Sequence, residues 1–251
     1  MQAFGTHAGS LIRHRFAGLL LALVALFLSA CSSTHVRTDA EFDVARDLGG
    51  KSVVLVEPSI QLFEMQASGL MEPRADWTRA AREKLPAAIN AILDQRKANL
   101  KPEYRVSADL PSDARPRQVL ALNEAVINTI FTHSYLHVPL PTRGASRRKP
   151  LSWTLGPGVS AIREETGADY MLTVIVRDSY TSTGRAALMI LAAALQIGVL
   201  QGGQQFGVAT LVDLRTGDVV WFNVLSDSLG DLRDVEGAQA TASKLLKGLP
   251  L

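Results

Sequence analysis

The position of the single cysteine, Cys31, directly behind a short apolar run constrains this chain more than any other feature. The run covers residues 16–28, whereas a helix needs about 17–25 apolar residues to cross a bilayer. Basic residues precede the run and small residues follow it: Arg13, Arg15, Ser29 and Ala30. This order is typical of a secretory signal peptide rather than a permanent span. We therefore assign residues 1–30 to a signal peptide and expect the fold to form from the rest.

The stretch Leu28-Ser29-Ala30-Cys31 resembles the signal box of bacterial lipoproteins. The resemblance implies that cleavage leaves Cys31 as a lipid-modified first residue with three acyl chains. One chain anchors a protein weakly, and two or more hold it stably. Acylation would also remove an exposed thiol that has no disulfide partner in its own chain. The alternative is an ordinary secreted protein with a cysteine at the cleavage point.

Ser32 bears on which membrane would hold the anchor. In Gram-negative members of the lipoprotein family, an Asp at this position favours retention at the inner membrane. Ser32 therefore predicts the periplasmic face of the outer membrane.

The charge of the mature chain excludes a general attraction to nucleic acid. Loss of Arg13 and Arg15 leaves 24 of the 26 basic residues, which equals the 24 acidic residues. A chain without net charge has no overall basic field to attract a polyanion. The partners predicted from the sequence are the membrane, through Cys31, and a cell-envelope protein or further copies of this chain.

The mature chain is expected to have a polar tether over residues 31–50 and one periplasmic α/β domain over residues 51–251. Residues 53–56 are a continuous apolar run, which predicts a strand buried on both faces, and Pro58 should end its pairing on one side. Asp76 is expected to cap a helix that Pro86 kinks or divides. A weak strand at 103–110, a helix with Pro116 in its first turn, and a final helix over 234–246 complete the outline.

Two further segments predict the centre of a sheet. Residues 170–176 are apolar apart from Thr173, which favours a central strand behind a helix that stops at Gly167. Two apolar runs flank the residues Arg215 to Asp218, where Gly217 can supply the positive φ of a hairpin turn. The resulting element order predicts a mixed sheet with helices packed on it.

This order, with "TGADYMLTV" and "LVDLRTGDVVWFN", resembles the fold shared by the TolB N-terminal domain, CsgG and LpoB-type lipoproteins. The resemblance covers about residues 50–248 and concerns patterns of strand and turn rather than chemical motifs. It implies docking or assembly in the cell envelope, without catalysis. No binding residue of that family can be matched to a residue of this chain.

Candidate chemical sites in the sequence all have simpler explanations. His133 and His137 have the i, i+4 spacing of metal ligands, but no Glu or third ligand accompanies them. "GPGVS" at 156–160 could hold an anion at a helix start, yet it lacks the Walker lysine. Acidic pairs fit solvated helix and turn positions: Glu164 and Glu165, Asp213 and Asp218. We therefore predict no catalytic residue, metal or cofactor, and lipidation at Cys31 as the one functional site.

A basic loop remains open to two interpretations. Arg143, Arg147, Arg148 and Lys149 form the densest basic run of the chain. It could bind an anionic envelope polymer, but a solvated loop is the explanation we prefer.

The apolar segment 186–200, "AALMILAAALQIGVL", predicts a hydrophobic helical insert whose only polar side chain is Gln196. It is short for a membrane span and apolar on all sides. Three interpretations compete: a helix buried in its own domain, an interface between copies, or a membrane-contacting element. We expect a helix that is covered, by its own domain or by another copy.

The sequence thus predicts a lipid-anchored, non-catalytic periplasmic lipoprotein that binds or assembles with envelope partners. A subunit of an oligomeric CsgG-like export channel is one alternative, although CsgG uses amphipathic membrane hairpins and this insert does not alternate polar and apolar residues. An envelope hydrolase is the other alternative.

Overall fold

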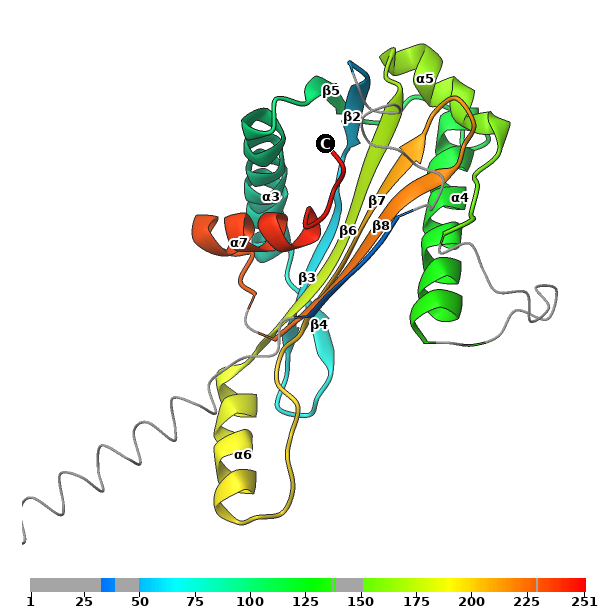
Figure 1. Ribbon diagram of the computed structural model, residues 1–251. Helices are drawn as coiled ribbons and strands as arrows, with labels where there is room; N and C mark the ends of the chain where they lie inside the picture. Colours follow the sequence, from blue (N-terminus) through cyan, green and yellow to red (C-terminus); the bar gives the residue numbers. More distant parts are fainter. Residues whose placement is uncertain (1–32, 39–49, 137, 139–150, 229) are drawn as a thin grey trace, which may run out of the picture.

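A mixed β-sheet is the framework of the fold (Figure 1). The computed structural model describes residues 33–38, 50–136, 138, 151–228 and 230–251, and within these ranges eight strands join one sheet. The strands follow the order β1-β8-β7-β6-β2-β5, and β3 and β4 lie beside the second half of β6. Their bounds are β1 Ser33–Thr38, β2 Ser52–Val56, β3 Ser59–Met65, β4 Met71–Pro73, β5 Asn99–Tyr104, β6 Tyr170–Thr181, β7 Gln205–Asp213 and β8 Val219–Asp227.

The central strand β6 organises the sheet because it pairs along both edges. Its first half runs parallel to β2 and its second half runs parallel to β3. Between β2 and β3, Pro58 interrupts the ladder, since a proline has no backbone N–H to donate. The other edge of β6 pairs antiparallel with β7. All five residues of β2 are buried, which confirms the strand predicted from residues 53–56.

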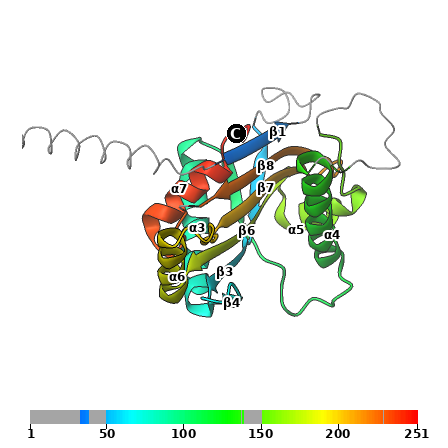
Figure 2. The same ribbon diagram turned by 90° about the horizontal axis from the view of Figure 1, so that it is seen from below.

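Helices cover both faces of the sheet and create two cores (Figure 2). Helices α3 and α7 pack on one face, while α4 and α5 pack on the other. Neighbouring residues of β8 separate the two cores, because Trp221 belongs to the first core and Phe222 to the second. The helix bounds are α3 Ala75–Gln95, α4 Arg115–Ile130, α5 Ser160–Thr166, α6 Thr183–Ala194 and α7 Val235–Leu245. The mixed α/β class predicted from the sequence is confirmed.

Several local predictions differ from the structure. Helix α3 begins at Ala75 and Arg74 is its N-cap, so Asp76 lies in the first turn, where it pairs with Arg74 instead of capping. Pro86 does not divide α3, which continues to Gln95 with Pro86 on its buried side. The weak strand lies at 99–104 instead of 103–110, since only that stretch runs beside β2.

The predicted tether is the main correction to the domain boundaries. The sequence predicts a tether over residues 31–50, but Ser33–Thr38 form β1, which pairs antiparallel with β8 over its whole length. An otherwise open edge of β8 would expose unpaired N–H and C=O groups, and β1 satisfies them whatever its side chains are. Residues 33–38 therefore belong to the sheet. The signal peptide, Cys31 and residues 39–49 lie outside the described residues.

The β7–β8 hairpin confirms the predicted turn at Gly217. The two strands pair from Gln205–Asp227 to Val212–Val219, and Gly217 has a φ of +85°. A Cβ at this position would lie 2.3 Å from the carbonyl oxygen of Gly156, so the turn is closed against a neighbouring loop.

Gly217→Val is therefore expected to lower the free energy of unfolding by about 1–3 kcal/mol, because a branched side chain is strained at positive φ and its Cβ would clash with the Gly156 carbonyl oxygen. Chemical denaturation measures the change. Gly167→Val is the matched control, since Gly167 has a φ of +63° with open space around it and should lose less stability. An unchanged midpoint for Gly217→Val would contradict this description of the turn.

Candidate functional site

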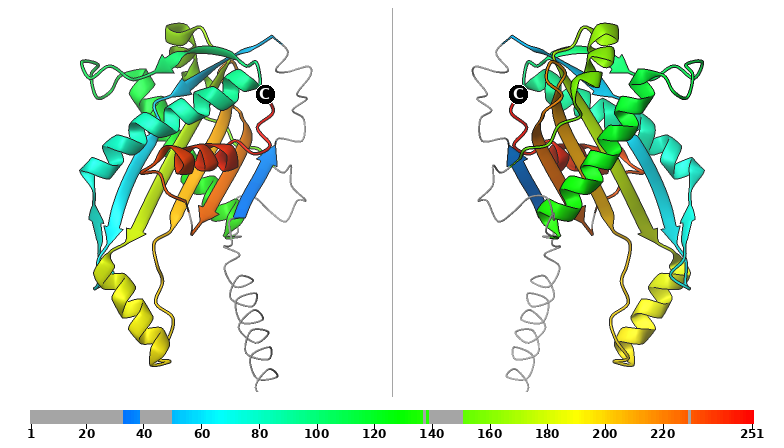
Figure 3. Two further views of the ribbon diagram at one scale, coloured as in Figure 1. Left: turned by 90° about the vertical axis from the view of Figure 1, so that its left-hand side faces the viewer. Right: turned by 90° about the vertical axis from the view of Figure 1, so that its right-hand side faces the viewer.

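The strand β6 runs directly into a helix that extends beyond the end of the sheet (Figures 1 and 3). Ser182 caps α6, and its hydroxyl accepts a hydrogen bond from the Arg185 backbone N–H at 3.2 Å. The helix ends near Gln196, which has a φ of +55°, and the chain returns to β7 without further regular structure. We call residues 183–203 the α6 projection. The predicted helical insert at 186–200 is thus helical as far as Ala194.

The α6 projection exposes its apolar side chains to solvent. Within α6 only Ala192 is buried, whereas Ile190 is 72% exposed and Leu191 52% exposed. Beyond the helix, Val199 is 98% exposed. The expectation that the helix is covered by its own domain is therefore wrong. Apolar residues on every side are typical of a buried helix, but this one emerges from the ends of β6 and β7, where none of the described residues forms a layer over it.

The base of the projection is tied to the β3–β4 hairpin. The Arg185 guanidinium donates to the carbonyl oxygens of Gln201, at 3.0 Å, and Ala67, at 3.5 Å. At the same hairpin, Leu70 is 72% exposed and Met71 is 45% exposed. The exposed apolar surface thus continues from α6 onto the neighbouring hairpin.

A buried carboxylate lies near the foot of the projection. Asp178 of β6 is 1% exposed, and its Oδ2 accepts from the Tyr180 hydroxyl at 2.6 Å and the Gln205 side-chain amide at 2.8 Å. The Tyr180 hydroxyl also accepts from the Leu232 backbone N–H at 2.7 Å, and the Thr241 hydroxyl donates to Gln205 Oε1 at 3.0 Å. The cluster therefore joins β6 and β7 to α7 and the loop before it.

The surroundings of Asp178 shift its ionisation. Burial raises the pKa of Asp178 to about 6, although the hydrogen bonds from Tyr180 and Gln205 act in the opposite direction. Burial, followed by the negative charge of Asp178, raises the pKa of Tyr180. Asp178 Oδ1 has no hydrogen-bond partner within the described part of the chain. The adjoining cavity has a volume of about 100 Å³, below the ~300–1,000 Å³ of usual ligand pockets. The cluster is suited to holding segments together rather than to binding a substrate.

A wider groove lies along β1. It has a volume of about 690 Å³ and is lined by β1 together with Phe131, Tyr135, Phe206 and Val224. The Tyr135 hydroxyl donates to the His35 carbonyl oxygen at 2.5 Å, and burial raises the pKa of Tyr135 to about 12. The groove is open and mixed in polarity, so it could receive a segment of a protein partner.

The candidate residues taken from the sequence do not converge. Cys31, His137 and the basic loop from Arg143 to Lys149 lie outside the described residues. The His133 ring contacts the Val138 carbonyl oxygen at 2.6 Å. In the ranges that the structure describes, no group of three His, Cys, Asp or Glu side chains is placed to hold a metal ion.

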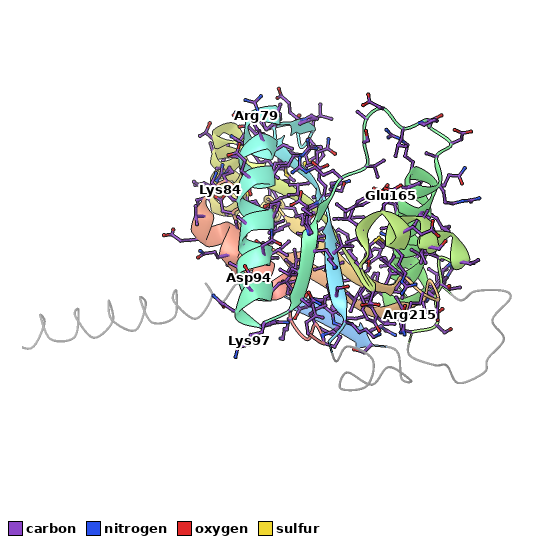
Figure 4. All side chains as sticks on the ribbon, turned by 90° about the horizontal axis from the view of Figure 1, so that it is seen from above. Arg79, Lys84, Asp94, Lys97, Glu165 and Arg215 are labelled. Atoms are coloured by element: carbon purple, nitrogen blue, oxygen red, sulfur yellow. The ribbon has the colours of Figure 1, made fainter. Side chains whose placement is uncertain are left out.

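The acidic pairs and the glycine-rich turn have structural roles. Glu165 of α5 accepts from the Tyr104 hydroxyl at 2.5 Å (Figure 4). Asp213 forms an ion pair with Arg215 at 2.7 Å beside the hairpin turn. Residues 157–166 form a short 3₁₀ turn, Pro157–Val159, followed by α5, and Gly167 ends this helix with a left-handed conformation as predicted.

Asp178 and the exposure of α6 were missed from the sequence. The sequence feature that could have drawn attention to Asp178 is its position in "TVIVRDSY", where an acidic residue lies near the end of a mainly apolar strand. Its partner Gln205 is 27 positions away in the sequence, and Thr241, which donates to Gln205, is further still, so no local pattern could identify the cluster.

Comparison with known proteins leaves the family of this chain open. The chain matches no protein-family model and no curated protein. Among solved structures it is similar to the PelC dodecamer from Paraburkholderia phytofirmans, with 13% identity and a TM-score of 0.37 over 86% of this chain and 95% of that one. A variant of that PelC dodecamer has 12% identity and a TM-score of 0.36, over 86% of this chain and 96% of the variant chain. Likenesses this weak assign neither a family nor a function.

In the described ranges, no helix is long and apolar enough to cross a membrane.

Proposed function

We propose that this chain is a lipid-anchored lipoprotein at the periplasmic face of the outer membrane. Its domain binds or assembles with cell-envelope partners and carries out no catalysis. The anchor in this proposal is Cys31, within Leu28-Ser29-Ala30-Cys31, and Ser32 is the reason for preferring the outer membrane.

One observation supports this proposal most directly: a strand of the sheet begins only two residues after the cysteine. Strand β1 begins at Ser33, and its register places Ser33 opposite Ser226 at the end of β8. Two residues of chain reach at most about 7 Å. A lipid on Cys31 would therefore hold the end of the sheet directly at the membrane surface instead of suspending the domain on a long tether.

The finer fold assignment is part of the proposal. We propose that the domain belongs with the TolB N-terminal, CsgG and LpoB-like domains. The central strand β6 and the β7–β8 hairpin carry the sequence patterns on which that resemblance depends, and both lie in one mixed sheet between helical layers. The groove beside β1 is the surface we assign to a protein partner, since it lies along an edge strand of the sheet and is lined by aromatic side chains.

Replacement of the anchoring cysteine tests the proposed function. In cells fed a labelled fatty acid, Cys31→Ala should abolish labelling of this protein and leave unprocessed or soluble chain, because the alanine side chain cannot be acylated. Wild-type protein should carry the label and fractionate with outer membranes.

Ser33→Ala is the control for this experiment, since it changes the neighbouring sequence but keeps the thiol. Equal labelling of the wild type and Cys31→Ala would contradict the lipid anchor. Labelled wild-type protein confined to the inner-membrane fraction would contradict the assignment to the outer membrane.

A further inference from the structure

We propose that the α6 projection is a second membrane contact, inserted into the same lipid leaflet that holds the acyl chains of Cys31. The proposal rests on the proposed lipid anchor and adds to it a lipid-binding surface on the folded domain. Its occupant is the acyl-chain region of one leaflet.

The strand register places the start of β1, two residues after Cys31 in the sequence, and the projection at the same end of the sheet. Ser33 lies opposite Ser226 on β8, and Ser226 lies opposite Phe206 on β7. At the same end, Gln205 pairs with Asp178 of β6, just before that strand passes into α6. Two strand spacings, about 10 Å, separate β1 from β7. Figure 3 shows β1 starting from the end of the sheet beyond which α6 extends. A membrane that holds Cys31 is therefore also within reach of the projection.

The distribution of apolar side chains around α6 favours lipid over a protein partner. Leu188 and Leu191 lie on one side of the helix, while Ile190 lies on nearly the opposite side, given about 100° per residue, and all three are exposed. The sequence contains no charged residue from 186 to 212. A second copy of the chain would cover one side and leave the other in water, whereas acyl chains surround the whole helix. Protein interfaces also commonly have a polar rim, whereas from residue 186 to 203 the projection has only Gln196 and Gln201 as polar side chains.

The length of the projection matches insertion into a single leaflet. Twelve helical residues extend for about 18 Å, close to half of the ~30 Å hydrocarbon thickness of a bilayer. Arg185 lies at the base, where it donates to the carbonyl oxygens of Gln201 and Ala67. A cation at this position marks the level of the lipid headgroups, because arginine keeps its charged end at the polar boundary. The exposed Leu70 and Met71 of the neighbouring hairpin extend the apolar surface beside that level.

Depth-dependent quenching tests the contact in the acylated, full-length protein. Acylation consumes the thiol of Cys31, so an engineered cysteine is the only site for an environment-sensitive fluorophore. Label at Leu191→Cys or Val199→Cys should be quenched at least about twofold by vesicles of phosphatidylethanolamine and phosphatidylglycerol that carry a quencher on the acyl chains, because the helix should lie among those chains. Glu164→Cys is the control, exposed on α5 at the opposite end of the sheet, and its emission should not change.

A second experiment introduces a charge at the centre of the projection. Leu191→Glu should reduce the quenching at Val199→Cys severalfold and leave the melting temperature unchanged, since Leu191 is half exposed in the folded domain. Leu122→Glu is the matched control, because Leu122 is similarly exposed on α4, and it should leave the quenching intact.

The outcomes separate this inference from the lipid anchor. If the protein floats with the vesicles but neither projection label is quenched, the membrane contact is wrong and the anchor stands. Blue-shifted emission that lipid quenchers do not affect and dilution reverses would show that a second copy covers the helix, which also overturns the inference. If Cys31 still reacts with thiol reagents, the proposed lipid anchor fails instead.

Discussion

Trp221→Ala and Phe222→Ala are each expected to lower the free energy of unfolding by about 3–5 kcal/mol, the usual loss when a large buried aromatic side chain is removed. The two residues are neighbours on β8, and both are fully buried. Trp221 packs in the core under α3 and α7, whereas Phe222 packs in the core under α4 and α5. Because one strand contributes to both layers, each replacement should leave a cavity in a different core.

Chemical denaturation of both variants, monitored by far-UV circular dichroism, measures the loss. Ser226→Ala is the control, since this exposed residue of the same strand should change the stability little. If one aromatic replacement is costly and its neighbour is neutral, then the layer over the neutral position is not a packed core and the two-core description is wrong.

Asp178→Asn should remove a pH dependence of folding worth about 3 kcal/mol. Burial raises the pKa of Asp178 to about 6 in the folded protein, from an ordinary value of 3.8, and each unit corresponds to about 1.4 kcal/mol. Between these values the folded chain holds a proton that the unfolded chain has released. The contribution of Asp178 is therefore fully present below pH 4 and is lost as the pH rises through 6. Asparagine presents the same acceptor to Tyr180 and Gln205 but does not ionise.

The measurement compares the stability of wild type and Asp178→Asn across pH 4–7. The unfolding free energy of the variant minus that of the wild type should rise by about 3 kcal/mol as the pH rises. Taking this difference cancels the contributions of the other carboxylates, which both proteins share. Asp94→Asn, which removes an exposed charge on α3 (Figure 4), should follow the wild-type profile. Parallel profiles for Asp178→Asn and wild type would contradict the burial of an ionisable group at this position.

Local patterns in the sequence were sufficient for much of the fold. The apolar run 53–56 predicts β2 because a strand covered on both faces needs apolar residues at every position. Gly167 and Gly217 mark a helix end and a hairpin because both positions need a positive φ. Helix α7, with Asp234 as its N-cap, follows from the same kind of local evidence.

Features that depend on distant neighbours could not be predicted in this way. The polar residues of β1 have no strand pattern, and they form a strand because the backbone edge of β8 is available to pair with them. Likewise, the hydrogen bond from Gln205 to Asp178 requires β6 and β7 to lie side by side. Neither contact is present until the sheet has formed.

The sequence by itself predicted an apolar helix over residues 186–200, which the structure confirms as far as Ala194, and it predicted the anchor at Cys31 from an adjacent run of residues. Only the tertiary structure decided that this helix is uncovered, and that it lies at the end of the sheet where β1 begins. The physical reason is that helix propensity and hydrophobicity depend on the residues themselves and their near neighbours. Burial depends on which other segments the fold places next to the helix, and in the part of the chain that the structure describes, none covers it beyond the ends of β6 and β7.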